Sequence, residues 1–171
     1  IKIIAVGAGY AYSEDGPTHH ACEDIAIMRT LDGMQIYSPS NAVMTSNLVD
    51  ISLDTSMPMY IRMDKGIYSN FKEDINYDLG LDVDSLGHDL CIVSTGTIHN
   101  VAIDLSRILF ENGIKSTVLD IFRLKPLNTK LLSQILEDHT HVVTIEEHTL
   151  NGGLGSIVAE HILDNDLHCA L

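Results

Sequence analysis

The sequence predicts an α/β protein made of two successive parallel-sheet units, each with three layers, joined by an acidic linker. Apolar, β-branched runs alternate with helical patterns along most of the 171 residues, and turn residues follow the expected strands. This alternation is typical of parallel sheets, because each helix returns the chain to the same end of the sheet. The periodicity is lost once, so we expect units at 1–71 and 90–171 with a linker at 72–89.

The first unit contains three expected strands, at 1–6, 34–37 and 59–63. A helix is expected from Thr18, whose hydroxyl suits an N-cap, and a second helix after the turn at 38–41. The strand ends are of most interest, because functional loops in such sheets follow the carboxyl ends of strands. The residues expected near these ends are Gly7, Ser38 and Arg62.

The linker is expected where acidic residues and glycines interrupt any periodic pattern. Its acidic residues are Glu73, Asp74, Asp78, Asp82, Asp84 and Asp89. The second unit then repeats the strand and helix pattern. Its strands are expected at 90–93, 116–121 and 141–145, and its helices after 94–97 as far as Gly113, at 129–137 and at 155–163.

Composition excludes several classes of function. The 24 acidic and 10 basic residues give a formal charge of −14, which disfavours nucleic acid and anionic membranes as partners. Cys22, Cys91 and Cys169 are scattered and show neither a disulfide framework nor a zinc pattern, so a reducing cytoplasm is expected. No run is long enough to span a membrane, and the chain starts at Ile1, which suggests a piece of a longer protein.

The stretch DGPTHHACEDIAIMR at 15–29 is the strongest functional signal. It combines a glycine-proline turn with paired histidines, His19 and His20, beside the Asp15 carboxylate. Histidine titrates near neutral pH and can both donate and accept a proton, so these residues could serve acid–base chemistry. The spacing alone equally fits a polar turn with solvated histidines, because adjacent residues on a helix point to different sides.

Two segments together resemble the transketolase family. DGPTHHACEDIAIMR resembles the segment of its pyrimidine-binding domain, and IEEH at 145–148 with NGGLG at 151–155 resembles its C-terminal domain. YIRMDKG at 60–66 lies between them in the family's order. The resemblance covers nearly the whole chain and implies that Asp15 contacts a substrate hydroxyl. It places His19 by the aminopyrimidine of thiamine diphosphate and the substrate oxygen, and it gives Arg62 a sugar phosphate to bind.

The chain departs from that family at several points. Gly7 stands where transketolases place a second phosphate-contacting histidine, which makes sugar phosphates doubtful substrates. His20 stands where many transketolases carry glutamine and deoxyxylulose-phosphate synthases carry a histidine, and Lys65 has no clear counterpart and is expected to be solvated. Glu146-Glu147-His148 could be read as a catalytic cluster, but the resemblance assigns that motif to assembly, away from the cofactor.

The resemblance implies the C-terminal portion of an enzyme that transfers a two-carbon ketol unit between sugars with thiamine diphosphate. The family's essential glutamate, its diphosphate-binding domain and its Mg²⁺ ligands are absent from this chain. We therefore expect the chain to be inactive alone, and to act as a homodimer or with a separate N-terminal subunit. The alternatives are a deoxyxylulose-phosphate synthase, a 2-oxoacid dehydrogenase β subunit and a non-catalytic assembly module.

Overall fold

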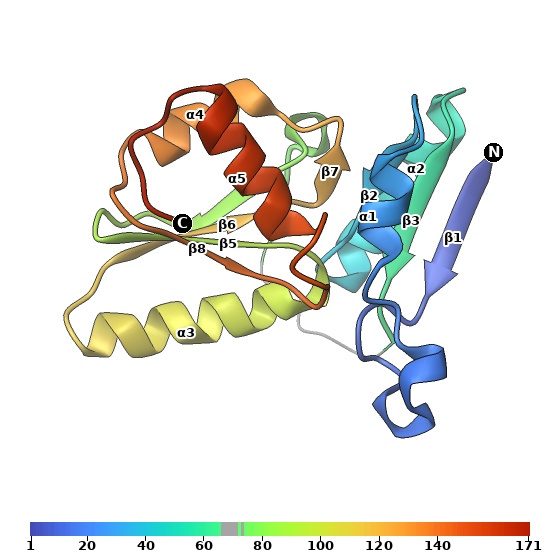
Figure 1. The fold of residues 1–171 in the computed structure, drawn as a ribbon, viewed down its shortest axis with the longest axis horizontal. Coiled ribbons are helices and arrows are strands. Elements are labelled where there is room, and N and C mark those ends of the chain that lie inside the picture. The colour runs from blue at the N-terminus through green and yellow to red at the C-terminus, as the bar shows by residue number, and fades with distance from the viewer. Residues whose placement is uncertain (66–71, 73) are drawn as a thin grey trace.

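The computed structural model describes residues 1–65, 72 and 74–171, and it confirms the two α/β units (Figure 1). One sheet has the strand order β1-β3-β2-β7 and the other β4-β6-β5-β8. Each sheet joins three parallel strands to one antiparallel edge strand, so both are mixed rather than wholly parallel. The strands are β1 (Lys2–Val6), β2 (Gln35–Tyr37), β3 (Met59–Met63), β4 (Asp82–Ser85), β5 (Leu90–Ser94), β6 (Ser116–Asp120), β7 (Arg123–Lys125) and β8 (Val142–Ile145).

Five α-helices and four short 3₁₀ turns are found in the described part of the chain. The α-helices are α1 (Asp24–Arg29), α2 (Ala42–Asp54), α3 (His99–Glu111), α4 (Thr129–Leu136) and α5 (Leu154–Asp164). The 3₁₀ turns are η1 (Ser13–Asp15), η2 (Pro17–His19), η3 (Tyr77–Leu79) and η4 (Gly96–Ile98). No helix in this part is both long and apolar enough to cross a membrane.

Helices cover both faces of each sheet. In the first sheet, Ile36 packs with Ile25 of α1, whereas the next residue, Tyr37, packs with Met44 and Leu48 of α2. Since successive strand residues point to opposite faces, α1 and α2 lie on opposite sides of this sheet. In the second sheet α3 covers one face, and α4 and α5 cover the other (Figure 1). The three-layer arrangement is therefore present in both units.

Strand β7 joins the two units. It comes from the second unit in sequence, but it pairs antiparallel with β2 and forms an edge of the first sheet. The largest apolar cluster likewise combines Ile25 and Ile36 of the first unit with Leu119 and Ile157 of the second. The units therefore share one core and are not simply held by a connecting segment.

The segment expected as a linker is partly ordered into the second sheet. Asp82–Ser85 forms β4, which pairs antiparallel with β6, and Leu81 is 2% exposed within the shared core. Leu81 and Val83 provide the apolar contacts that the surrounding acidic residues obscured in the sequence. Residues 66–71 and Glu73 lie outside the described residues, so the boundaries of the first unit stay a prediction.

The first helix begins later than expected. Thr18 lies in the 3₁₀ turn η2, His20 is extended with φ −75° and ψ 130°, and α1 starts only at Asp24. The extended backbone is needed because Ala21 pairs with Gly9 across the base of a loop. The expectation that His19 and His20 lie on a helix N-terminus, with Thr18 as its cap, is therefore wrong.

Candidate functional site

The candidate site lies at the carboxyl edge of the first sheet, as the sequence predicts. Gly7 directly follows β1, Ser38 follows β2, and Arg62 is the penultimate residue of β3. From this edge a loop, residues 10–20, projects away from the rest of the chain, as the blue segment of Figure 1 shows. This loop carries Asp15 and His19.

A short backbone bridge closes the base of this loop. The Gly9 amide donates to the Ala21 carbonyl at 3.1 Å, and the Ala21 amide donates to the Gly9 carbonyl at 2.9 Å. Gly9 has φ +55°, and a Cβ added there would lie 2.5 Å from Glu147 Cβ of the second unit. The base of the loop therefore packs directly against the segment that follows β8, with no room for a side chain.

Gly9→Ala is expected to lower the free energy of unfolding by about 2–4 kcal/mol, because positive-φ strain and overpacking act together. The matched control is Gly113→Ala, since Gly113 has φ +83° but nothing lies within 4 Å of its added Cβ. Gly113→Ala should therefore show the loss in free energy of unfolding that is caused by the positive φ alone. Urea unfolding of both variants measures the difference, and equal losses would contradict the predicted contact with Glu147.

Asp15 and His19 are both exposed on the projecting loop. Asp15 ends the turn η1 and His19 ends η2, with Gly16 between the two turns at φ +78°. His19 Nδ1 lies 3.0 Å from Thr18 Oγ1, which orients the imidazole and leaves Nε2 for another partner. The two side chains are therefore presented to solvent or to a second chain rather than buried in this one.

Tyr12 is a residue of this loop that the sequence did not single out. Gly7 has φ +97°, and a Cβ there would collide with Tyr12 Cε2, so the tyrosine ring occupies the space beside Gly7. The Lys65 ammonium stacks over the Tyr12 ring at 4.3 Å from its centroid, and the His19 ring is 6.2 Å away. Lys65 is exposed, as expected, but it makes a cation–π contact.

His20 packs against another residue of the same loop. Its ring meets the Tyr10 ring edge-on at 4.9 Å, and its Nε2 is buried without a hydrogen-bond partner among the described residues. A buried ring nitrogen left unpaired costs free energy, so it is a natural point of contact for a group bound at this edge.

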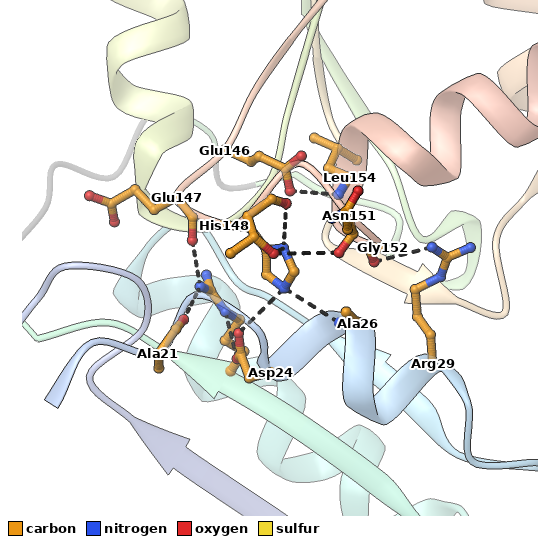
Figure 2. Close-up of polar contacts among 12 residues, drawn as sticks. Ala21, Asp24, Ala26, Arg29, Glu146, Glu147, His148, Asn151, Gly152 and Leu154 are labelled. Atoms are coloured by element: carbon orange, nitrogen blue, oxygen red, sulfur yellow. Dashed lines mark hydrogen bonds and ion pairs between the residues drawn. The ribbon is translucent and has the colours of Figure 1, made fainter. Parts of the chain in front are cut away.

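Arg62 is buried rather than open to a ligand. Its side chain is 5% exposed, and its Nε donates to Asp24 Oδ2 at 2.8 Å. Its Nη2 donates to the carbonyls of Ala21, at 3.0 Å, and Glu147, at 2.9 Å. Tyr60 Oη donates to the same Asp24 oxygen at 2.7 Å. The pKa of Tyr60 is raised, mainly by burial and secondly by the negative charge of Asp24. Figure 2 shows the partners of the guanidinium, which are Asp24 and Ala21 of the first unit and Glu147 of the second.

In the Glu146-Glu147-His148 segment, the side chains of Glu146 and His148 make structural contacts with the ends of two helices, and Glu147 contributes its carbonyl to Arg62 (Figure 2). Glu146 caps α5, because its carboxylate accepts from the Leu154 amide at 2.5 Å and the Gly155 amide at 2.8 Å. His148 Nε2 accepts from the Ala26 amide in the first turn of α1 at 3.4 Å. This histidine therefore supplies the cap that was expected from Thr18.

Glu147 turns its side chain toward the candidate site. Burial, together with the nearby Asp64 carboxylate, raises the pKa of Glu147. A pocket of about 350 Å³ lies beside it, between the loop and the second unit, lined also by Tyr10, Lys65 and Thr97. The site edge is thus partly walled by the second unit.

A second polar cluster is buried where the two sheets meet. His99 Nε2 lies 2.6 Å from Asp84 Oδ2 and its Nδ1 lies 2.7 Å from Ser94 Oγ. Asp120 is 2% exposed, and burial raises its pKa to about 6, although His99 and a hydrogen bond from Ser40 act against the rise. Burial alone would lower the pKa of His99, but Asp120 and Asp84 together raise it. This arrangement resembles an acid–histidine–serine triad, but Ser94 is fully buried and cannot meet a substrate.

No group of three or more His, Cys, Asp or Glu side chains that could hold a metal ion occurs in the described part of the chain. The loop itself can offer the acid–base and hydrogen-bonding groups of Asp15 and His19.

Comparison with known proteins shows the family of this chain. Residues 1–70 match the family model described as transketolase, pyrimidine binding domain, and residues 80–170 match transketolase, C-terminal domain. An apulose-4-phosphate transketolase subunit from Phocaeicola vulgatus is 36% identical over 170 residues, covering 96% of this chain and 54% of the relative. A putative transketolase C-terminal section from Methanocaldococcus jannaschii is 35% identical over 175 residues, with 98% and 54% covered.

A solved structure described as a split gene transketolase, inactive beta4 tetramer, superposes with a TM-score of 0.85 at 35% identity. The match covers 95% of this chain and 53% of that one. A Pichia stipitis transketolase superposes with a TM-score of 0.77 at 20% identity, covering 89% and 24%, which shows the shared fold. This chain spans about half the length of the first curated relatives. It belongs to the transketolase family and corresponds to that family's C-terminal part.

Proposed function

We propose that this chain is the C-terminal portion or subunit of a thiamine diphosphate-dependent enzyme that transfers a two-carbon ketol unit between small sugars. The observation that carries this proposal is the loop of residues 10–20, which presents Asp15 and His19 at the carboxyl edge of a sheet in a chain of this family. Such an edge is the usual place for ligands in α/β proteins.

His19 is proposed as the acid–base residue. Its exposed imidazole can donate to a substrate oxygen that gains negative charge and can take the proton back later. Asp15 is proposed to accept a hydrogen bond from a substrate hydroxyl. The orphaned His20 Nε2 fits a polar ring bound beside the loop, so the residues present suit one side of the cofactor. Thiamine diphosphate, when bound, would supply the nucleophilic carbon that holds the two-carbon unit.

The rest of the site is proposed to come from another chain or segment. Asp15 and His19 are exposed on the projecting loop, and the Mg²⁺ ligands are proposed to lie outside this chain. Relatives named as one subunit of a transketolase favour a separate N-terminal subunit, and a homodimer is the alternative. We place the complete enzyme in the cytoplasm, in keeping with three free cysteines.

The proposed donor is a small ketose. Gly7 argues against a sugar phosphate, whereas Lys65 places a positive charge over the Tyr12 ring, and the relatives named as subunits carry a phosphorylated sugar in their names. Free and phosphorylated ketoses should therefore be compared directly.

The test uses two samples, the 171-residue chain and the complete protein from the natural start codon with any separate subunit. Thiamine diphosphate and Mg²⁺ are titrated into each by calorimetry, and transfer from a ketose to an aldose is then assayed. We expect the complete protein to bind the cofactor and transfer the ketol unit, and the 171-residue chain to do neither. If the complete protein neither binds thiamine diphosphate nor transfers a ketol unit, the proposal is contradicted and a non-catalytic assembly module is favoured.

A deoxyxylulose-phosphate synthase is the second candidate. Such an enzyme from Chlamydia felis is 35% identical over 162 residues, covering 90% of this chain and 25% of the relative, and the His19-His20 pair fits that group. Adding a 2-oxoacid donor separates the two candidates, because this donor must lose CO₂ whereas a ketose does not. Release of CO₂ coupled to product formation would favour this candidate or a 2-oxoacid dehydrogenase β component.

A further inference from the structure

We propose that Arg62 is a positioning residue that clamps the base of the loop carrying Asp15 and His19 to the second unit, and that it does not bind substrate. This inference rests on the proposed function for its kinetic consequence, and it has a structural consequence that is measured without any assay of activity.

The first step is the direction of the Arg62 hydrogen bonds. One nitrogen, Nη2, donates to both Ala21 O and Glu147 O, and these two carbonyls belong to different units (Figure 2). Ala21 is also the residue that pairs with Gly9 to close the loop. Removing Arg62 therefore frees one end of the loop and its attachment to the second unit together.

The second step is the neutralisation of Arg62. Asp24 is 13% exposed at its side chain, and its Oδ2 accepts from both Arg62 Nε and Tyr60 Oη. The buried charge is thus paired and hydrogen-bonded on the protein side, as a structural guanidinium requires. A phosphate ligand would instead need to compete with this carboxylate at a 5% exposed side chain.

The third step is packing at the other end of the loop. Gly9 lies against Glu147 Cβ and Oε2, so the loop base is held between Arg62 on one side and the Glu147 segment on the other. Small displacements of this base would be transmitted to Asp15 and His19. Misplacement of a reacting group by about 1 Å can cost about 100-fold in rate.

The experiment compares two variants that disrupt the clamp with one matched control. Arg62→Lys cannot reproduce the forked contacts of the guanidinium. The double variant Asp24→Asn/Arg62→Gln removes both buried charges at once, which keeps a folded sample available if the single variant fails to fold. The control is Arg29→Ala, because Arg29 also crosses between the units, to Gly152 O at 3.1 Å and Glu160, without touching the loop base.

The first readout is amide hydrogen exchange at Gly9 and Ala21 in the natural full-length protein. Both clamp variants should speed exchange at these two amides at least about 10-fold, whereas Arg29→Ala should leave them unchanged. Unchanged exchange in the clamp variants would overturn the proposal, whatever the enzyme does.

The second readout is steady-state kinetics of the complete enzyme with a free and a phosphorylated ketose. We expect kcat to fall about 10- to 100-fold on both donors in the clamp variants, with little change in the ratio of their KM values. Kinetics like those of the unmodified enzyme would refute positioning. A rise in KM for the phosphorylated donor alone would show instead that Arg62 binds phosphate. If the unmodified enzyme transfers no ketol unit, the proposed function fails, and the exchange measurement still decides whether the clamp exists.

Discussion

Replacing His19 by alanine in the complete enzyme is expected to lower kcat by about 100- to 10,000-fold, the usual loss when a positioned acid–base group is removed. His19 is exposed and makes its hydrogen bond to the neighbouring Thr18, so its removal should leave folding and assembly intact. Ketol transfer measures the rate, and light scattering measures the mass of the assembly.

His141 offers a closely matched control. It is also exposed, and its Nδ1 lies 2.9 Å from Thr140 Oγ1, just as His19 Nδ1 lies 3.0 Å from Thr18 Oγ1. His141→Ala should therefore leave turnover unchanged. Equal turnover in the His19→Ala and His141→Ala variants would show that His19 is not the acid–base residue. A smaller assembly in His19→Ala would show instead that His19 has a structural role.

Asp120→Asn should increase the free energy of unfolding by up to about 3 kcal/mol at pH 8. Burial raises the Asp120 pKa from 3.8 to about 6, and a pKa difference of this size corresponds to about 3 kcal/mol. A raised folded-state pKa means that the protonated form is favoured in the fold. The contribution of protonated Asp120 to the stability of the fold is thus fully present below pH 3.8 and is lost as pH rises through about 6. The raised pKa of His99 acts in the same direction, above its ordinary 6.5.

Thermal and urea unfolding between about pH 4.5 and 8 measure this dependence. The unmodified protein should lose stability at the upper end of the range, and Asp120→Asn should lose less. Asp50→Asn is the control, because Asp50 lies exposed on α2. Parallel curves for the unmodified protein and Asp120→Asn would show that protonation of Asp120 does not contribute. In that case His99→Gln would test the remaining titrating group of the cluster.

The periodic elements were predictable because local patterns and tertiary packing agree in them. The strands near 1–6, 59–63 and 90–93 lie where the sequence predicts them, and in the last helix Ile157 and Val158 are buried. In α3, by contrast, the apolar side chains of Val101 and Ile108 are 51% and 57% exposed. That helix is apolar over more of its circumference than the sheet covers.

Elements that depend on distant partners were not predictable. β7 is only three residues long and exists because β2 offers it an edge, and β4 is hidden among acidic residues. The late start of α1 has the same origin. Its cap comes from His148, 122 residues away along the chain, and no local pattern could indicate it.

In the candidate site, the sequence indicated the chemistry of Asp15 and His19 and the edge on which they lie, and their roles stay predictions. It could not indicate the packing between units that buries Arg62, or the packing within the first unit that places Tyr12 against Gly7. A guanidinium near the end of a strand suits a phosphate as well as a buried carboxylate. Only the position of Asp24, fixed by the fold, distinguishes these environments.

The pairing of β7 with β2 of the first sheet also limits where a gene for such an enzyme can be divided. A break between the two units would put β2 and the strand that completes its sheet on different polypeptides, with half of a shared core on each. Each product would have to fold with an open sheet edge and an exposed apolar surface before finding the other, which invites aggregation. A coding boundary ahead of β1 avoids this hazard, since it keeps both units and their common interior on one translation product.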